Sequence, residues 1–167
     1  RWMCLQEKPR VVADIAHNEA GIQEVVQSLA RYSYKQLHIV FGAVQDKEVS
    51  KVLALLPQDA HYYACAPNLP RALAVEQLLE KIEFSGRRGE RFNSVQSAYN
   101  KAVQQASADD FVLVCGSNFV VAEVLESMVS ITEAEKAGRI ELKQTDVVIN
   151  MPQIVWPEGK MIVKEDK

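Results

Sequence analysis

Short apolar segments alternate with amphipathic segments along most of this chain. The apolar segments have the length and the Val, Ile and Leu content of buried strands, and the segments between them carry apolar residues at helical spacing. The predicted strands cover residues 2–6, 10–15, 37–44, 61–66 and 111–115. The predicted helices cover residues 19–31, 48–56, 71–82, 95–106 and 119–128. This alternation is typical of βαβ units. We therefore expect an α/β fold of the Rossmann-like, doubly wound kind, with a mostly parallel sheet of about six strands and helices on both faces.

The first predicted helix shows the helical pattern most clearly. Ile22, Val25, Val26 and Leu29 follow the i, i+3, i+4, i+7 spacing of one apolar face. The Gly-Arg-Arg-Gly segment at 86–89 instead predicts an exposed polar loop, to which no function is assigned.

Composition excludes several classes of protein. Of the 167 residues, 48% are hydrophobic and 25% are charged, which indicates a globular domain, and the net charge of −3 favours neither nucleic acid nor an anionic membrane as a partner. No apolar run approaches the roughly 18 residues of a transmembrane helix. The scattered cysteines Cys4, Cys65 and Cys115 predict reduced thiols in a cytoplasmic protein, expected to be a monomer. His38 and His61 fall within strand patterns and are expected to be structural.

Three polar clusters follow predicted strands directly. Asp14, His17 and Asn18 form the first, residues 42–47 the second, and residues 116–118 the third. Because parallel strands joined by right-handed crossovers end at the same edge of a sheet, these clusters are expected to converge there. Ligands bind at that edge in open α/β sheets, so the sequence predicts a binding site.

Each of these residues also has a purely structural explanation. Asn18 and Ser117 are good helix N-caps with or without a ligand. His17 by itself suits a hydrogen-bonded structural histidine, and Asp46 with Lys47 suits a solvated turn before a helix. The residues alone leave both explanations open.

Three motifs in the right order favour the functional explanation, most strongly for Asp14 and His17. The segment at 14–18 is similar to the Asp-x-Ala-His-Asn signature of the Mur ligase superfamily, although Glu19 replaces the proline that usually follows it. Residues 41–47 resemble the Gly-x-x-x-Asp-Lys loop of that superfamily, and residues 114–119 resemble the Gly-Ser pair that opens its final helix. With Arg1 in the place of a junction arginine, residues 1–128 resemble the carboxyl-terminal domain of folylpolyglutamate synthase/dihydrofolate synthase.

The resemblance implies that part of the chain binds a nucleotide. Arg1 is expected to reach the ATP phosphates, because a planar guanidinium with several donors suits phosphate oxygens. Asp14 is expected to hold the ribose hydroxyls, and Asn18 to shape the same cleft. The implied cofactors are ATP and Mg²⁺, with no metal ligand expected in this chain.

The resemblance also implies a glutamate site. His17 is expected near the transferred phosphate or the incoming glutamate, as the catalytic residue, and Ser117 is expected to hold a glutamate carboxylate at a helix N-terminus. Asp46 and Lys47 are expected to contact the substrate as well. The partners implied are L-glutamate, ATP, and a folate or dihydropteroate.

The chain lacks the phosphate-binding loop that this activity requires. That loop has the pattern Gly-x-x-x-x-Gly-Lys-Ser/Thr, whereas Gly159-Lys160 is followed by Met161 and has Ile154 at the position of the first glycine. We therefore expect the chain to be an inactive part of an ATP-dependent, amide-forming ligase. The alternatives are the equivalent domain of another Mur-type amino-acid ligase and a non-catalytic, doubly wound binding module.

The residues after 128 have no counterpart in the family pattern. Residues 132–137 predict a further helical turn or two, and residues 146–150 and 161–164 predict a hairpin across 152–159. Residues 129–167 are therefore expected to form a carboxyl-terminal extension.

Overall fold

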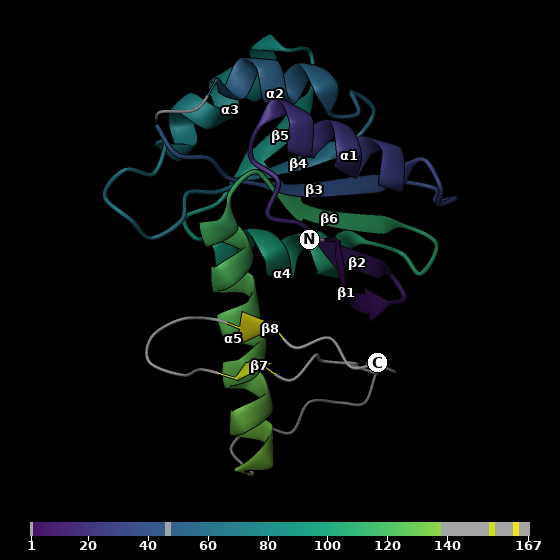
Figure 1. Ribbon diagram of the computed structural model, residues 1–167, viewed down its shortest axis with the longest axis vertical. Helices are drawn as coiled ribbons and strands as arrows, with labels where there is room; N and C mark the ends of the chain where they lie inside the picture. The colour runs from purple at the N-terminus through teal and green to yellow at the C-terminus, as the bar shows by residue number, and fades with distance from the viewer. Residues whose placement is uncertain (1, 46–47, 138–153, 156–161, 164–167) are drawn as a thin grey trace.

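A six-stranded sheet forms the centre of the protein, with the strand order β1-β2-β6-β3-β4-β5 (Figure 1). The computed structural model describes residues 2–45, 48–137, 154–155 and 162–163. The strands are Met3–Glu7 (β1), Arg10–Ala13 (β2), Leu37–Phe41 (β3), His61–Ala64 (β4), Arg88–Arg91 (β5) and Phe111–Cys115 (β6). Within this sheet, β1 pairs antiparallel with β2, and the other four pairings are parallel. The mostly parallel α/β fold predicted from the sequence is confirmed.

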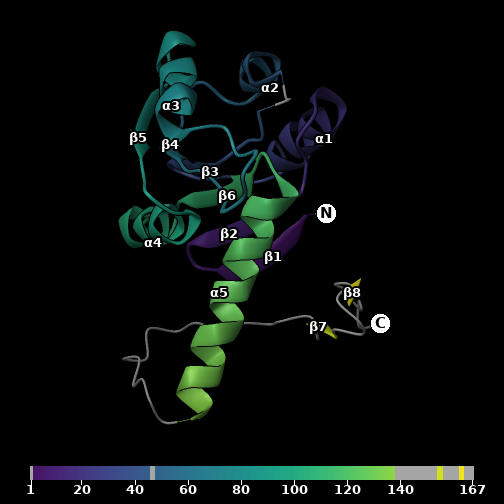
Figure 2. The ribbon, with the colours of Figure 1, turned by 90° about the vertical axis from the view of Figure 1, so that its left-hand side faces the viewer.

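Five helices cover the two faces of the sheet (Figure 2). They are Glu19–Leu29 (α1), Val49–Leu55 (α2), Val75–Phe84 (α3), Val95–Gln105 (α4) and Asn118–Lys136 (α5). Helices α1, α2 and α3 pack on one face, and α4 and α5 on the other. Successive residues of the central strands supply the two cores: Ile39 of β3 faces the first three helices, while Val40 faces the other two.

The predicted polar loop at 86–89 is wrong. Residues Arg88–Arg91 form the edge strand β5, and Arg87 just before it is buried. The Arg87 guanidinium donates to the carbonyl oxygens of Leu56 at 2.8 Å and Ser85 at 3.1 Å. Backbone carbonyl groups at the end of α2 and after α3 therefore hydrogen-bond the buried Arg87 cation, which the sequence analysis predicted to be exposed.

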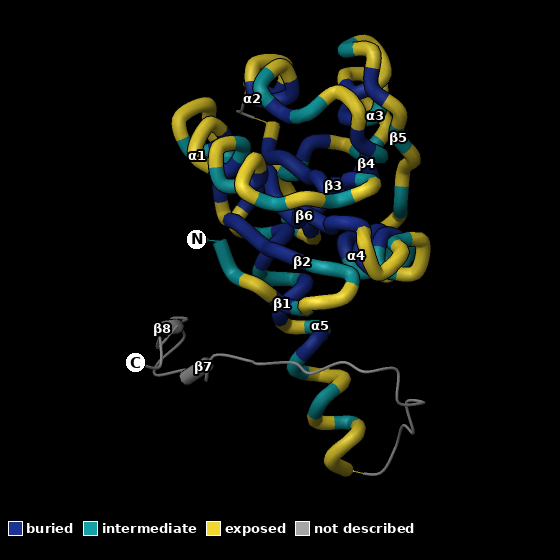
Figure 3. The backbone as a smooth tube through the Cα atoms, turned by 90° about the vertical axis from the view of Figure 1, so that its right-hand side faces the viewer, coloured by how far each residue is buried: buried dark blue, intermediate teal, exposed yellow. Residues whose placement is uncertain are grey.

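The last helix is longer than predicted. Residues 132–137 were expected to be separate from a helix ending near Met128, but α5 continues without a break to Lys136. Figures 1 and 2 show its last turns extending beyond the sheet, and Figure 3 shows that these turns are largely exposed. The segment Glu133–Lys136 consists of residues with good intrinsic helix propensity, which accounts for the extension.

The predicted hairpin has a different first strand. Ile154–Val155 (β7) pairs antiparallel with Ile162–Val163 (β8), so residue 154 lies within the stretch predicted as a turn. The strand predicted at 146–150 lies outside the described residues. Among the residues that the structure describes, no helix is both long and apolar enough to cross a membrane.

Candidate functional site

The carboxyl ends of β2, β6 and β3 lie next to one another at one edge of the sheet. Strand β2 pairs in register with β6, and two further bonds continue this contact past the strands: Asp14 N–H donates to Val114 O at 2.9 Å, and Gly116 N–H donates to Ala16 O at 3.0 Å. The turn after β2 is thereby bonded to the loop that carries Ser117. The structure places both on one edge, as parallel topology predicts.

Two glycines allow this close approach. A Cβ at Gly116 would lie 2.5 Å from the Phe41 ring and 2.6 Å from the Gly42 carbonyl oxygen, and Gly116 also has a φ of +99°. A Cβ at Gly42 would lie 2.8 Å from the Cys65 carbonyl oxygen. The ends of β3, β4 and β6 are therefore packed too tightly for any other residue at these positions.

Asp14 holds the turn after β2 in place through hydrogen bonds to the backbone. Its side chain is buried, and its two oxygens accept N–H bonds from Trp2 at 2.7 Å and Ala16 at 2.8 Å. An ionised carboxylate accepts about four hydrogen bonds, so Asp14 keeps acceptor capacity toward a ligand. Asp14 thus fixes the turn through Ala16 and also bonds the backbone of Trp2. Trp2 follows Arg1, which lies outside the described residues.

His17 is half-buried at the surface of this turn. Its Nδ1 lies 3.0 Å from the carbonyl oxygen of Ile15. Because a carbonyl oxygen can only accept, Nδ1 carries a proton, which leaves the lone pair at Nε2 whenever the ring is in its neutral form. No hydrogen bond to that nitrogen occurs within the described part of the chain. In its neutral form, His17 can therefore accept a proton at Nε2.

The polar residues after the turn and after β6 are helix caps. Asn18 caps α1, with its Oδ1 accepting from Gly21 N–H at 2.9 Å. Ser117 caps α5, with its Oγ accepting from Phe119 N–H at 3.2 Å, and it is buried. Their structural interpretation is therefore correct, which leaves a ligand role for either residue untested. Residues 46–47 lie outside the described residues.

A pocket of about 180 Å³ opens between the turn and α1. Its lining consists of Trp2, residues 14–18, and Gly21, Glu24, Val25 and Ser28 of α1. The sequence analysis did not identify Trp2, Glu24 or Ser28 as site residues. Helical spacing could have identified Glu24 and Ser28, because positions 21, 24, 25 and 28 share one face of α1. Ser117 does not line this pocket.

Other chemistries have less support at this edge. Burial raises the pKa of the Cys65 and Cys115 thiols far above its ordinary value, so neither is a ready nucleophile. Within the described ranges, no three His, Cys, Asp or Glu side chains are grouped so that they could hold a metal ion. The described residues thus do not form a Mg²⁺ site by themselves.

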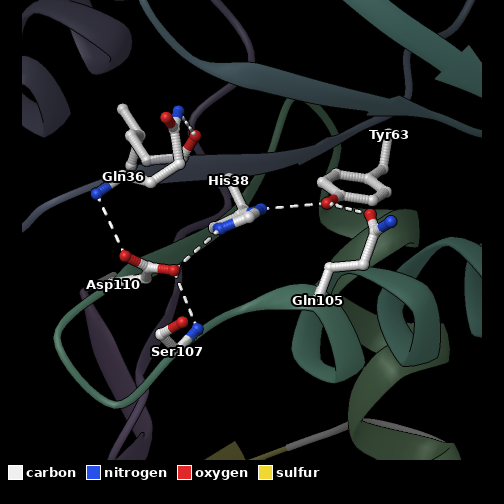
Figure 4. A network of polar contacts seen from close by, with 7 residues as sticks. Gln36, His38, Tyr63, Gln105, Ser107 and Asp110 are labelled. Atoms are coloured by element: carbon white, nitrogen blue, oxygen red, sulfur yellow. Dashed lines mark hydrogen bonds and ion pairs between the residues drawn. The ribbon is translucent and has the colours of Figure 1, made fainter.

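A second polar cluster lies at the opposite edge of the sheet, and Figure 4 shows it. The Nδ1 of His38 lies 2.9 Å from the hydroxyl of Tyr63, and its Nε2 lies 3.4 Å from Asp110. The Tyr63 hydroxyl also lies 2.7 Å from the Gln105 side-chain oxygen, and Asp110 accepts the Ser107 N–H at 2.7 Å. Both nitrogens of this buried histidine have partners, so the cluster is structural, as predicted for His38.

Comparison with known proteins points to one family. The sequence profile of the Mur ligase, glutamate ligase domain matches residues 1–118. A probable bifunctional folylpolyglutamate synthase/dihydropteroate synthase of Halobacterium salinarum is 38% identical over 124 residues, which is 74% of this chain and 15% of that protein. The dihydrofolate synthase/folylpolyglutamate synthase of Escherichia coli is 34% identical over 140 residues, which is 83% of this chain and 31% of that protein.

The fold is similar to that of solved ligases. A crystal structure of a bifunctional folylpolyglutamate synthase/dihydrofolate synthase with Mn, AMPPNP and L-glutamate bound matches with a TM-score of 0.71 and 30% sequence identity. The match covers 77% of this chain and 31% of that one. The chain thus spans about a third or less of the length of these relatives.

Proposed function

Because this chain belongs to the Mur ligase family of glutamate ligase domains, we propose that it forms the glutamate-binding part of an ATP-dependent ligase that adds glutamate to a folate or dihydropteroate. One observation carries the proposal: the turn with Asp14 and His17 is hydrogen-bonded to the loop that precedes Ser117 and α5. A proton acceptor, a carboxylate and a helix N-terminus thereby share one sheet edge. Nucleotide, metal and glutamate are all bound in a relative of similar fold.

The pocket beside Asp14 fits part of a nucleotide. Its volume of about 180 Å³ is smaller than the roughly 300–1,000 Å³ of sites that enclose a whole small ligand. Asp14 offers carboxylate oxygens, which suit ribose hydroxyls, and Asn18 lies at the same opening. The proposed site has three further residues: Arg1 binds the phosphates, and Asp46 and Lys47 contact the substrate.

His17 has the atom that the amine chemistry needs. ATP, when bound, would supply the activation of the acceptor carboxylate, which the glutamate amine then attacks with release of phosphate. The amine reacts only after its ammonium form has lost a proton. Nε2 of His17 can accept that proton, because Nδ1–H is committed to Ile15.

Ser117 and α5 are proposed to receive a glutamate carboxylate. Backbone N–H groups at a helix N-terminus attract anions, and α5 is a long helix that begins at this edge. Because the Ser117 oxygen already caps Phe119, its contribution to binding would be through its hydroxyl proton and its position rather than through a free oxygen.

An exchange experiment tests the proposal. The matching segment of the E. coli dihydrofolate synthase/folylpolyglutamate synthase is replaced by this chain, and incorporation of labelled glutamate into dihydropteroate is measured with ATP. The exchanged enzyme should ligate glutamate, whereas the 167-residue chain alone should neither ligate glutamate nor hydrolyse ATP. A folded exchanged enzyme without ligation, or steady ATP turnover by the purified chain, would contradict the proposal.

A further inference from the structure

Trp2 connects the polar turn with the segment that follows α1. Its backbone N–H donates to Asp14 Oδ2 at 2.7 Å, and Trp2 lines the pocket beside that carboxylate. The centre of its indole ring lies 5.8 Å from the centre of the Tyr32 ring, with an angle of 26° between the two planes. Trp2 therefore contacts the proposed nucleotide site with its backbone and a stacked aromatic ring with its side chain.

The backbone of Trp2 has an uncommon conformation. Its φ is +30°, and no other non-glycine residue in the described part of the chain has a positive φ. Residues with a side chain rarely adopt such a φ, and they keep it only where the surrounding contacts hold them. The bond to Asp14 holds the backbone of Trp2, and the stacked ring holds its side chain. Loss of the stacking would let the backbone relax and move its N–H away from Asp14.

Tyr32 is itself held in place by three contacts. The guanidinium carbon of Arg10 lies 5.0 Å from the centre of the Tyr32 ring, and the Phe111 ring meets it in an edge contact at 5.5 Å. The N–H of Tyr32 donates to Leu29 O at 3.0 Å, at the end of α1. Tyr32 does not line the pocket beside Asp14. Its effect on that pocket would therefore pass through Trp2.

The Asp14 carboxylate is the group that this support would orient. Its Oδ1 accepts from Ala16 N–H at 2.8 Å, and its Oδ2 accepts from Trp2 N–H at 2.7 Å. With one bond to each oxygen, the plane of the carboxylate is fixed and its remaining lone pairs keep one direction. Without the Trp2 bond the carboxylate could rotate, and a ligand hydroxyl would have to order it on binding, which lowers affinity.

We infer that Tyr32 is a positioning residue for nucleotide binding: it holds the Trp2 indole by stacking and thereby keeps the Asp14 carboxylate oriented toward the ligand. The inference rests on the proposed function, in which Asp14 binds the ribose hydroxyls. Tyr32 takes no part in the acyl chemistry and contacts neither the nucleotide nor glutamate.

The test uses the exchanged enzyme with Tyr32→Ala and Tyr32→Phe. We expect Tyr32→Ala to raise the KM for ATP by about 3- to 10-fold, which is the effect of one lost aromatic pair. The kcat and the KM for glutamate should stay within about two-fold. Tyr32→Phe should keep most of the affinity for ATP, because it retains the stacked ring and loses only the contact of the hydroxyl with Trp2 Nε1 at 3.4 Å.

Tyr34 provides a matched control. It lies in the same loop, and its ring also contacts the Phe111 ring, at 5.8 Å. Tyr34 does not line the pocket beside Asp14, and no stacking of its ring on Trp2 occurs in the described residues. Tyr34→Ala should therefore leave the KM for ATP unchanged, even where it lowers stability as much as Tyr32→Ala does.

A double variant tests whether Tyr32 acts through Trp2. In an enzyme that already carries Trp2→Ala, the further change Tyr32→Ala should not raise the KM for ATP again, because the connecting side chain is absent. The stacking itself is measured in the 167-residue chain with Trp156→Phe, which leaves Trp2 as the only tryptophan. Acrylamide should quench the Trp2 fluorescence more strongly in Tyr32→Ala than in Tyr34→Ala, because the indole loses the ring that covers it.

Three outcomes would overturn the inference while the proposed function stands. They are an unchanged KM for ATP in an active Tyr32→Ala enzyme, an equal increase in Tyr34→Ala, and increases that add in the double variant. If Tyr32→Ala does not fold, Tyr32→Leu takes its place, because leucine fills part of the volume without an aromatic face. Absence of ligation by the unmutated exchanged enzyme would instead contradict the proposed function.

Discussion

The two edges of the sheet each hold a histidine and an aspartate, yet the two pairs are built differently. At the amino edge, His38 and Asp110 are buried and bonded to each other, and both ring nitrogens of His38 have partners. At the carboxyl edge, Asp14 bonds backbone N–H groups, and His17 is half-exposed with one nitrogen engaged. The first pair has its partners within the fold, whereas the second keeps hydrogen-bonding capacity that no residue of the described part of the chain uses.

This difference separates stability from function in the same molecule. A polar group whose partners all lie inside the fold contributes to the unique packing of that fold and is costly to disturb. A polar group with an available atom at the surface costs little when nothing is bound and can interact with a ligand. We therefore expect mutations at the amino edge to change stability and mutations at the polar turn to change activity.

The largest loss of stability should come from the backbone beneath the turn. Gly116→Ala places a methyl group 2.5 Å from the Phe41 ring and 2.6 Å from the Gly42 carbonyl oxygen, at a φ of +99°. Because two strand ends would have to separate, we expect a loss of roughly 4 kcal/mol or more in the free energy of unfolding. Urea denaturation of the 167-residue chain measures this loss.

A matched glycine isolates the packing contribution. Gly86 also has a positive φ, of +77°, but the nearest atom to its added Cβ is the end of the flexible Gln58 side chain at 3.0 Å. Gly86→Ala should therefore cost only about 1 kcal/mol, from backbone strain. Equal losses for the two variants would show that the carboxyl edge is not packed as tightly as the distances indicate.

The features that sequence reasoning predicted have local signals. Apolar runs locate β3 and β6, and side chains with capping oxygens locate the starts of α1, α4 and α5. The three polar clusters follow from parallel topology, because each lies directly after a strand. The double role of Asp14, by contrast, depends on Trp2, which is 12 residues away and has no recognisable pattern.

The features that were missed depend on distant partners. Strand β5, with the sequence Arg-Gly-Glu-Arg, has no apolar alternation, and its pairing with β4 makes it a strand. Arg87 is buried because carbonyl groups from two other segments surround it. The contact of His38 with Asp110 spans 72 residues, and the pocket face of α1 can be identified only once the turn beside it is known.

A smaller effect is expected from acid at the amino edge. Burial lowers the pKa of His38 despite the neighbouring Asp110, with His61 adding to the decrease. The unfolded chain then binds a proton more readily than the native protein as the pH falls through about 6.5, so stability should decrease from pH 7.5 to pH 5. Burial alone would raise the pKa of Asp110, but hydrogen bonds from Ser107, His38 and Gln36 keep it low, and the contribution of Asp110 is lost only in more acidic solution.

Replacing each histidine separates their contributions. His38→Gln should remove the part of this decrease that is due to His38, whatever its effect on stability at pH 7.5. His61→Gln should change the slope less, because His61 only adds to the lowering of the His38 pKa and lies beside Glu90, 2.8 Å away. Urea denaturation at a series of pH values gives the slopes, and an unchanged slope in His38→Gln would show that burial of this ring is not the cause.

The smallest effect on stability should come from the residue with the largest expected effect on ligation. His17 is half-buried in a turn that Asp14 also fixes, so His17→Ala should change the free energy of unfolding by no more than about 0.5 kcal/mol. In the exchanged ligase the same change should lower kcat by roughly 10²–10⁴-fold if Nε2 accepts the proton of the amine.

His17→Asn separates the two nitrogens, because its amide can still donate to Ile15 from near the Nδ1 position and has nothing at Nε2. An inactive but stable His17→Asn enzyme would support the open nitrogen as the working atom. If His17→Asn retained activity, His17 would only stabilise the turn. His17 and His38 would then differ in exposure but not in catalytic role.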